Sequence, residues 1–150
     1  MVPLTKFDKY VERHARSFTE RLQALCRMPS VAARGTGMRA IAETVEQMMQ
    51  RVGVGTRSFR MSSGYPIIYG ECGSGPASYV IYGHYDVQPV GHLTEWSVGP
   101  FAATITDGKL YARGASAMSK RCVINGRTFS VPASIKSSTA SKFRCSVQRT

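Results

Sequence analysis

Residues 83–89, Gly-His-Tyr-Asp-Val-Gln-Pro, directly follow an apolar run at residues 77–82. The run predicts a buried strand, so the heptapeptide begins where that strand ends. His84 and Asp86 are two residues apart, and side chains with this spacing on an extended segment point to the same side. An imidazole beside a carboxylate suits metal ligation, or a ligand histidine with an orienting acid. A surface hydrogen-bonded pair is the alternative reading, because a zinc site needs three or four protein ligands.

Upstream of this stretch, the apolar residues recur at helical spacing. One amphipathic helix is predicted at about residues 5–27, ending before Pro29 because the residue before a proline avoids the helical region. A second helix is predicted at residues 38–52 and is closed by Gly53. The spacing that supports them comes from Phe7, Val11, His14, Phe18, Leu22 and Leu25 in the first and Met38, Ile41, Val45, Met48, Met49 and Val52 in the second.

The rest of the first 118 residues reads as strands. Short β-rich runs lie at residues 56–61, 66–71 and 77–82, and the last two are separated by a turn-forming segment at 72–76. Asp107-Gly108 sits between runs at 103–106 and 109–112, which is a strong signal for a two-residue hairpin. Two helices followed by strands predict an α/β or α+β arrangement.

The charge of the 150-residue chain is unevenly distributed. The formal net charge is +11, yet residues 120–150 hold seven Lys or Arg and no acid, and Asp107 is the last acidic residue. Ten of the 32 positions from Ser119 to Thr150 are Ser or Thr. We therefore predict two parts, residues 1–118 as folded protein and residues 119–150 as a basic, Ser-rich tail without regular structure.

The sequence also argues against several classes of protein. No apolar run approaches the ~18 residues that span a bilayer, and the first residues lack a signal-peptide core, so we expect a cytoplasmic protein without a membrane. The four cysteines, Cys26, Cys72, Cys122 and Cys145, form no CxxC pair, which predicts unpaired thiols rather than a zinc ribbon or disulfide scaffold.

The heptapeptide resembles the metal-binding signature of the zinc-dependent dipeptidase, acetylornithine deacetylase and succinyl-diaminopimelate desuccinylase family, and its Gln88-Pro89 ending is similar to the dipeptidase branch. Supporting similarities lie, in the same order along the chain, at residues 25–31, 95–96, 99–101, 105–111 and 112–116. The resemblance thus covers about residues 5–118, the N-terminal part of such an enzyme. It implies an α/β catalytic domain with a central mixed sheet flanked by helices.

The resemblance also implies the chemistry. His84 would ligate one of two divalent metal ions (zinc, with cobalt or manganese as alternatives), and Asp86 would act in catalysis by orienting that imidazole. The paired ions would polarise the scissile carbonyl and lower the pKa of a bridging water, with a glutamate further along as general base. The substrate would be a dipeptide or an N-acyl amino acid. Family members are often homodimeric, but we expect their inserted dimerisation domain to be absent from this chain.

The chain departs from the family at Ala117, where the resemblance calls for an aspartate that bridges both metals. A methyl group cannot coordinate a cation, and the tail offers no Asp, Glu or His to supply the later ligands. Similarity and composition break together, which suggests a frameshift or rearrangement after about Ser116. We therefore predict a hydrolase-type chain that is inactive and does not stably bind the metals. The alternatives are a non-catalytic partner of an intact homologue, or a weak nonspecific nucleic-acid binder through the tail, which is disfavoured because the tail has few aromatics and no binding motif.

Overall fold

The computed structural model describes residues 5–60, 62, 64–74, 77–118 and 141–148. Its main element is a four-stranded mixed sheet in the order β1-β2-β6-β3. The strands are β1 (Gly55–Phe59), β2 (Ile67–Cys72), β3 (Ala77–His84) and β6 (Ser141–Gln148). β1 and β6 each run antiparallel to β2, while β3 runs parallel to β6. The predicted α/β class with a central mixed sheet is confirmed.

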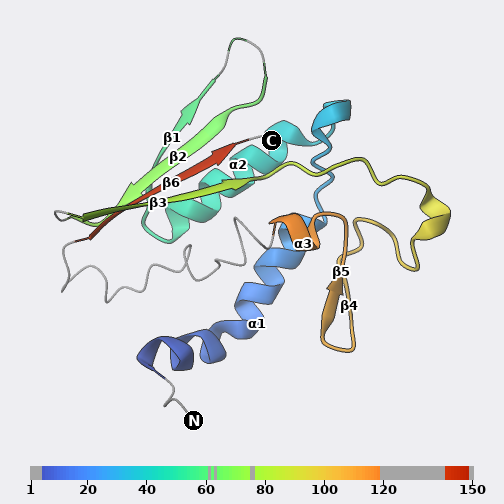
Figure 1. Ribbon diagram of the computed structural model, residues 1–150, viewed down its shortest axis with the longest axis horizontal. Helices are drawn as coiled ribbons and strands as arrows, with labels where there is room; N and C mark the ends of the chain where they lie inside the picture. The colour runs from blue at the N-terminus through green and yellow to red at the C-terminus, as the bar shows by residue number, and fades with distance from the viewer. Residues whose placement is uncertain (1–4, 61, 63, 75–76, 119–140, 149–150) are drawn as a thin grey trace.

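The two predicted helices are α1 (Lys6–Cys26) and α2 (Met38–Arg51). Thr5 caps α1 in a reciprocal capping box with Asp8, so the first turn has partners for two of its amide groups. α2 packs against the sheet through β1 and β2 (Figure 1). No helix among the described residues is long and apolar enough to cross a membrane.

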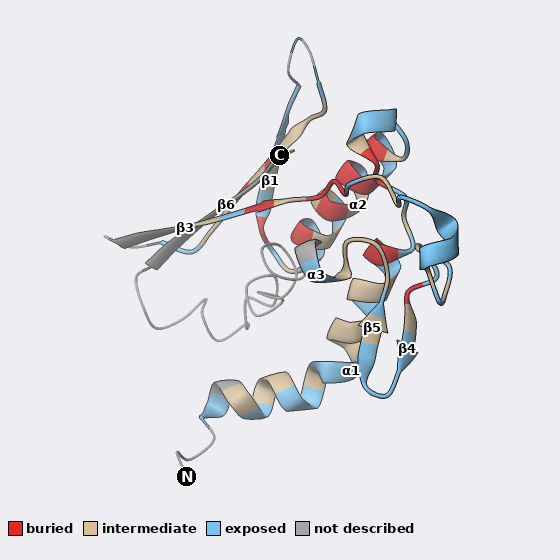
Figure 2. Cartoon of the chain, turned by 45° about the vertical axis from the view of Figure 1, so that its right-hand side comes forward, coloured by how far each residue is buried: buried red, intermediate tan, exposed pale blue. Residues whose placement is uncertain are grey.

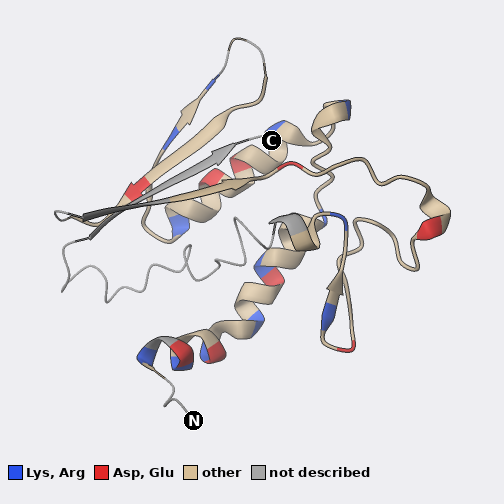
Figure 3. Cartoon of the chain, in the orientation of Figure 1, with Lys and Arg blue, Asp and Glu red and all other residues tan. Residues whose placement is uncertain are grey.

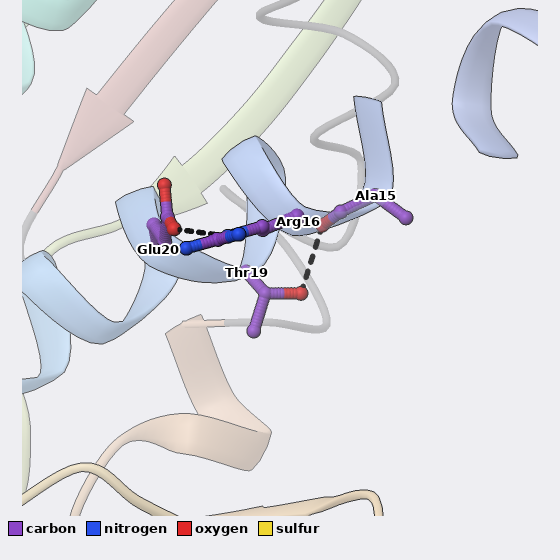
Figure 4. A network of polar contacts seen from close by, with 4 residues as sticks. All are labelled: Ala15, Arg16, Thr19 and Glu20. Carbon is purple, nitrogen blue, oxygen red and sulfur yellow. Dashed lines mark hydrogen bonds and ion pairs between the residues drawn. The ribbon is translucent and has the colours of Figure 1, made fainter. Parts of the chain in front are cut away.

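The N-terminal part of α1 extends away from the sheet, and the residues there whose burial the structure describes are exposed or half-buried (Figure 2). Arg16 and Glu20 form an ion pair one turn apart, and Thr19 donates a hydrogen bond to the Ala15 carbonyl (Figure 4). The Arg16 side chain is 91% exposed, so this pair stabilises the helix little. Acidic and basic residues are interspersed along α1 and α2 (Figure 3), as on an ordinary solvated helix surface.

The apolar core lies between α2 and the sheet and reaches to the end of α1. Ile41 and Met49 of α2 are completely buried, and Ile68 of β2 is only 1% exposed. The same cluster includes Leu25, Val31, Met38, Ala42, Val45, Val54, Tyr85 and Val87. The segment after β3 is therefore part of the core and not a surface loop.

The predicted hairpin is present as β4 (Thr104–Thr106) and β5 (Lys109–Tyr111). Asp107 and Gly108 both have positive φ, 50° and 71°, as a two-residue turn of this type requires. Shorter elements that were not predicted are the 3-10 turns η1 (Ala32–Arg34) and η2 (Leu93–Glu95) and the single-turn α3 (Ala115–Met118), which contains Ala117.

The structure differs from the sequence prediction in the tail. Ser141–Gln148, expected to lack regular structure, forms β6 between β2 and β3. The composition of one short segment does not reveal such a strand, because its partners lie 64 to 79 residues earlier in the chain. The remaining tail positions, 119–140 and 149–150, lie outside the described residues.

Gly37 holds the start of α2 against the turn that follows α1. It is the N-cap of α2 with φ +68°, and a Cβ built on it would lie 2.0 Å from the Pro29 carbonyl oxygen. That contact is with backbone, so no side-chain rotation could relieve it.

We therefore expect Gly37→Ala to lower the free energy of unfolding by about 2–3 kcal/mol, combining left-handed strain of roughly 1–2 kcal/mol with the displacement of Pro29. Gly108→Ala is the matched control, since Gly108 has a similar φ but nothing within 4 Å of its added Cβ. Urea unfolding followed by fluorescence of the single tryptophan measures both. Equal losses in the two variants would contradict the proposed contact.

Candidate metal-ligand site

The site is built where β3 ends. His84 is the last residue of β3, and Asp86 follows two residues later. The His84 Nδ1 atom lies 3.3 Å from Asp86 Oδ1 and 3.0 Å from the Asp86 main-chain oxygen. The expectation that the two side chains point to the same side is therefore confirmed, although Asp86 lies just beyond the strand.

Both atoms that face Nδ1 are hydrogen-bond acceptors. In its neutral form, an imidazole with two acceptors at Nδ1 carries its proton there and its lone pair on Nε2. A ring in this tautomer presents Nε2 to a metal, and a carboxylate at the other nitrogen holds the ring's orientation. The Asp86 carboxylate thus lies where an acid that orients this ring would lie.

Burial strengthens this pairing. The side chain of Asp86 is 7% exposed and that of His84 is 15% exposed. A carboxylate removed from water is costly unless polar groups compensate it, and the imidazole N–H is one such group. The surface-pair alternative is therefore disfavoured, because both members are largely withdrawn from solvent.

Main-chain contacts fix the segment that carries the pair. The Val87 amide donates to the Ser30 carbonyl at 2.9 Å, and Val31 and Val87 form an isolated parallel bridge. Tyr85, which lies between His84 and Asp86 in the sequence, is completely buried, and its hydroxyl donates to the Pro66 carbonyl at 2.7 Å. His84 and Asp86 therefore sit on a backbone that is tied to the turn after α1 and to the start of β2.

A second set of contacts holds the following loop. Arg113 donates from Nη2 to the Pro89 carbonyl at 2.6 Å, and its guanidinium lies 5.2 Å from the centroid of the Trp96 ring. Trp96 in turn donates from Nε1 to the Val90 carbonyl at 2.8 Å. Trp96 thus packs between Arg113 and the main chain at Val90.

Ser30, Tyr85 and Arg113 are supporting residues that the sequence reading did not single out by role. All three lie inside stretches that resemble the metallopeptidase family, at residues 25–31, 83–89 and 112–116. Their place in these stretches is the signal by which the sequence could have pointed to them. Their partners are 19 to 57 residues away, and such pairings cannot be read from local patterns.

The described residues do not by themselves complete a metal site. Among them, no three His, Cys, Asp or Glu side chains come together in a way that could hold an ion. His92 is exposed next to η2, and His14 hydrogen-bonds to the Tyr10 carbonyl on α1. The donors that the described residues place near the end of β3 are therefore too few for a two-metal centre.

The cysteines of the described part do not contribute either. Cys26 and Cys72 are free, as predicted, while Cys122 lies outside the described residues. Burial raises the pKa of the Cys26 thiol to about 11 and also raises the pKa of Cys72. Both thiols thus stay protonated near neutral pH, which is the opposite of what a metal ligand or nucleophile requires.

The larger of the described pockets lies elsewhere. Its walls come from α2, β1 and the start of β2, and they include Arg39, Glu43, Arg60 and Tyr65. His84 and Asp86 do not line it. The histidine–aspartate pair is therefore not located inside that pocket.

Comparison with known proteins bears on this site directly. Residues 80–125 match the model of peptidase family M20/M25/M40. The match includes His84, Asp86 and Arg113, and it extends past residue 118, where the boundary with the tail was predicted. The resemblance to this metallopeptidase family, expected from the sequence, is confirmed.

Two curated relatives illustrate the extent of the similarity. The succinyl-diaminopimelate desuccinylase of Parvibaculum lavamentivorans is 40% identical over 98 residues, which are 63% of this chain and 24% of that protein. The enzyme of the same name from Beijerinckia indica is 37% identical over 102 residues, covering 64% and 25%. The chain thus spans about a quarter of the length of the curated relatives it matches.

Solved structures confirm the fold. Human carnosine dipeptidase 1 superposes with a TM-score of 0.79 and 24% identity, over 97% of this chain and 34% of that one. The dipeptidase Dug1p of Saccharomyces cerevisiae gives a TM-score of 0.71 with 20% identity over the same shares. The M20 family metallo-carboxypeptidase Sso-CP2 of Sulfolobus solfataricus gives 0.68 and 24%, covering 87% and 30%.

The tautomer of His84 is the testable consequence of the geometry. We expect the ring ¹⁵N shifts of the wild-type chain to show Nδ1–H, and Asp86→Ala to raise the fraction of the Nε2–H form because one of the two acceptors is lost. Glu95→Ala, at an exposed acid on η2, should leave the spectrum of His84 unchanged. A wild-type ring protonated on Nε2 would contradict the assigned role of Asp86.

Proposed function

We propose that this chain carries one ligand position of a metal-dependent amide hydrolase, with His84 as the ligand and Asp86 as its orienting acid. The observation that carries the proposal is the buried His84–Asp86 contact at the end of β3, inside the segment that matches the peptidase family. The substrate class is a dipeptide or an N-acyl amino acid, in keeping with the names of the relatives, a desuccinylase and two dipeptidases. The metal class is divalent, with zinc, cobalt or manganese as candidates.

We further propose that these 150 residues do not catalyse this reaction by themselves. Ala117 has no donor atom at the position where the family resemblance requires a bridging aspartate. No Asp, Glu or His follows Asp107 in the sequence. The described residues offer one ligand where a catalytic zinc site uses three.

A turnover assay on the purified full chain tests the second part of the proposal. The chain is supplied separately with zinc, cobalt and manganese and given dipeptides and N-succinyl amino acids. We expect no metal-dependent product above an Asp86→Ala control, and no recovery in Ala117→Asp, because one added carboxylate still leaves the ligand set short. Metal-dependent turnover above the Asp86→Ala control would refute the proposed inactivity.

The ligand role of His84 is tested separately by a zinc titration observed through the ring ¹⁵N resonances. The Nε2 signal of His84 should respond at lower zinc concentration than those of His14 and His92, which have no neighbouring orienting carboxylate among the contacts described. Identical responses of the three histidines would remove the basis for a ligand site at the end of β3.

A further inference from the structure

The sheet contains a slot that is filled from far along the chain. β2 and β3 are consecutive in sequence, but they are not hydrogen-bonded neighbours. β6 lies between them, antiparallel to β2 from Ile68 to Cys72 and parallel to β3 from Ala77 to His84 (Figure 1). The walls of the slot are therefore complete before the strand that fills it begins.

We propose that this slot is an acceptor for a strand supplied by a second copy of the chain, so that two copies exchange Ser141–Gln148. The contacts would be those of β6 as it stands, because a strand from another copy has the same sequence and can take the same register. Exchange of an identical element is a low-cost route to a dimer for that reason. The inference is independent of the proposed hydrolase function.

Main-chain pairing makes the slot a strong binding site for an extended segment. A strand inserted between two others satisfies donors and acceptors on both of its edges, whereas a strand added at a sheet edge satisfies only one. β6 pairs with β3 over the whole length of both strands, from Ala77–Ser141 to His84–Gln148. An open slot would leave two neighbouring strand edges exposed, which favours capture of another strand.

The length of chain before β6 permits delivery to a neighbouring copy. Twenty-two residues, 119–140, separate Met118 of α3 from Ser141. At about 3.3–3.6 Å per residue, a segment of this length can reach roughly 70–80 Å when extended, which is more than the width of a domain of this size. The connection therefore does not restrict β6 to the slot of its own chain.

The charge of the segment suits its place in the slot. Lys142 and Arg144 make the segment basic, and it contains no acid. In the register, Arg144 stands directly opposite Glu71 of β2. A basic residue of the segment and an acidic residue of the slot thus occupy facing register positions, as favoured in antiparallel pairs.

Cross-linking between isotopically distinct copies of the full chain tests the proposal. A photo-reactive benzoylphenylalanine replaces Tyr79, which is paired with Phe143 in the register. This unlabelled chain is mixed in urea with ¹⁵N-labelled chain lacking the photo-reactive group, refolded at low or high concentration, irradiated and analysed by peptide mass spectrometry. We expect cross-links from position 79 to ¹⁵N-labelled residues 141–148, with a fraction that rises with concentration.

Two variants and a peptide control this experiment. Val147→Pro removes a main-chain donor within β6 and should abolish the cross-links between copies, whereas Ser137→Pro changes the same tail outside β6 and should preserve them. A synthetic peptide of residues 141–148, added to chains with the unmodified tail, should compete for the slot and lower the yield of cross-links between copies. This measurement keeps the test valid if Val147→Pro fails to fold.

Cross-links to residues 141–148 of the same copy only, at every concentration, would overturn the proposal. So would the absence of any cross-link to this segment, or cross-links between copies that persist unchanged in Val147→Pro, because these would show that no strand pairing in the slot is involved.

Discussion

The hydrogen bond from the Val87 amide to the Ser30 carbonyl joins the end of β3 to the turn that follows α1. Elements that are more than 50 residues apart in sequence meet at this point. Gly37 is required nearby because its lack of a Cβ lets the Pro29 carbonyl approach the start of α2. Val31 and Val87 also lie in the apolar core. The contact of Val87 with Ser30 and Val31, which we call the crossing, thus ties α1, α2 and the sheet into one packed unit.

The chemistry of the site follows from this crossing. A histidine and an aspartate two residues apart would be a common surface pair on a mobile loop. Here the intervening Tyr85 is buried and hydrogen-bonded to Pro66, and Val87, which follows Asp86, donates its amide to the Ser30 carbonyl. The Asp86 carboxylate is thereby held against His84 Nδ1 with little access to water. Preorganisation of this kind is what a ligand histidine needs.

Much of the local structure could be predicted from the sequence because it rests on short-range physics. Helical spacing identified α1 and α2 to within a residue or two, and Asp107-Gly108 identified the hairpin. Strand periodicity predicted that His84 and Asp86 point to the same side, but not that the pair is buried. The supporting partners Ser30, Pro66 and Arg113 could not, since each pairing depends on how distant segments meet. β6 was missed for the same reason: its strand character comes from the slot between β2 and β3 rather than from its Ser-rich, basic neighbourhood.

Native-state hydrogen exchange of the Val87 amide tests most directly whether the crossing organises the fold and the site. If it does, this amide exchanges only through global unfolding, with a protection equal to that of the Ile41 amide in the buried part of α2. Exchange of Val87 at the rate of an exposed amide, such as that of Gln88, while Ile41 remains protected would contradict the account.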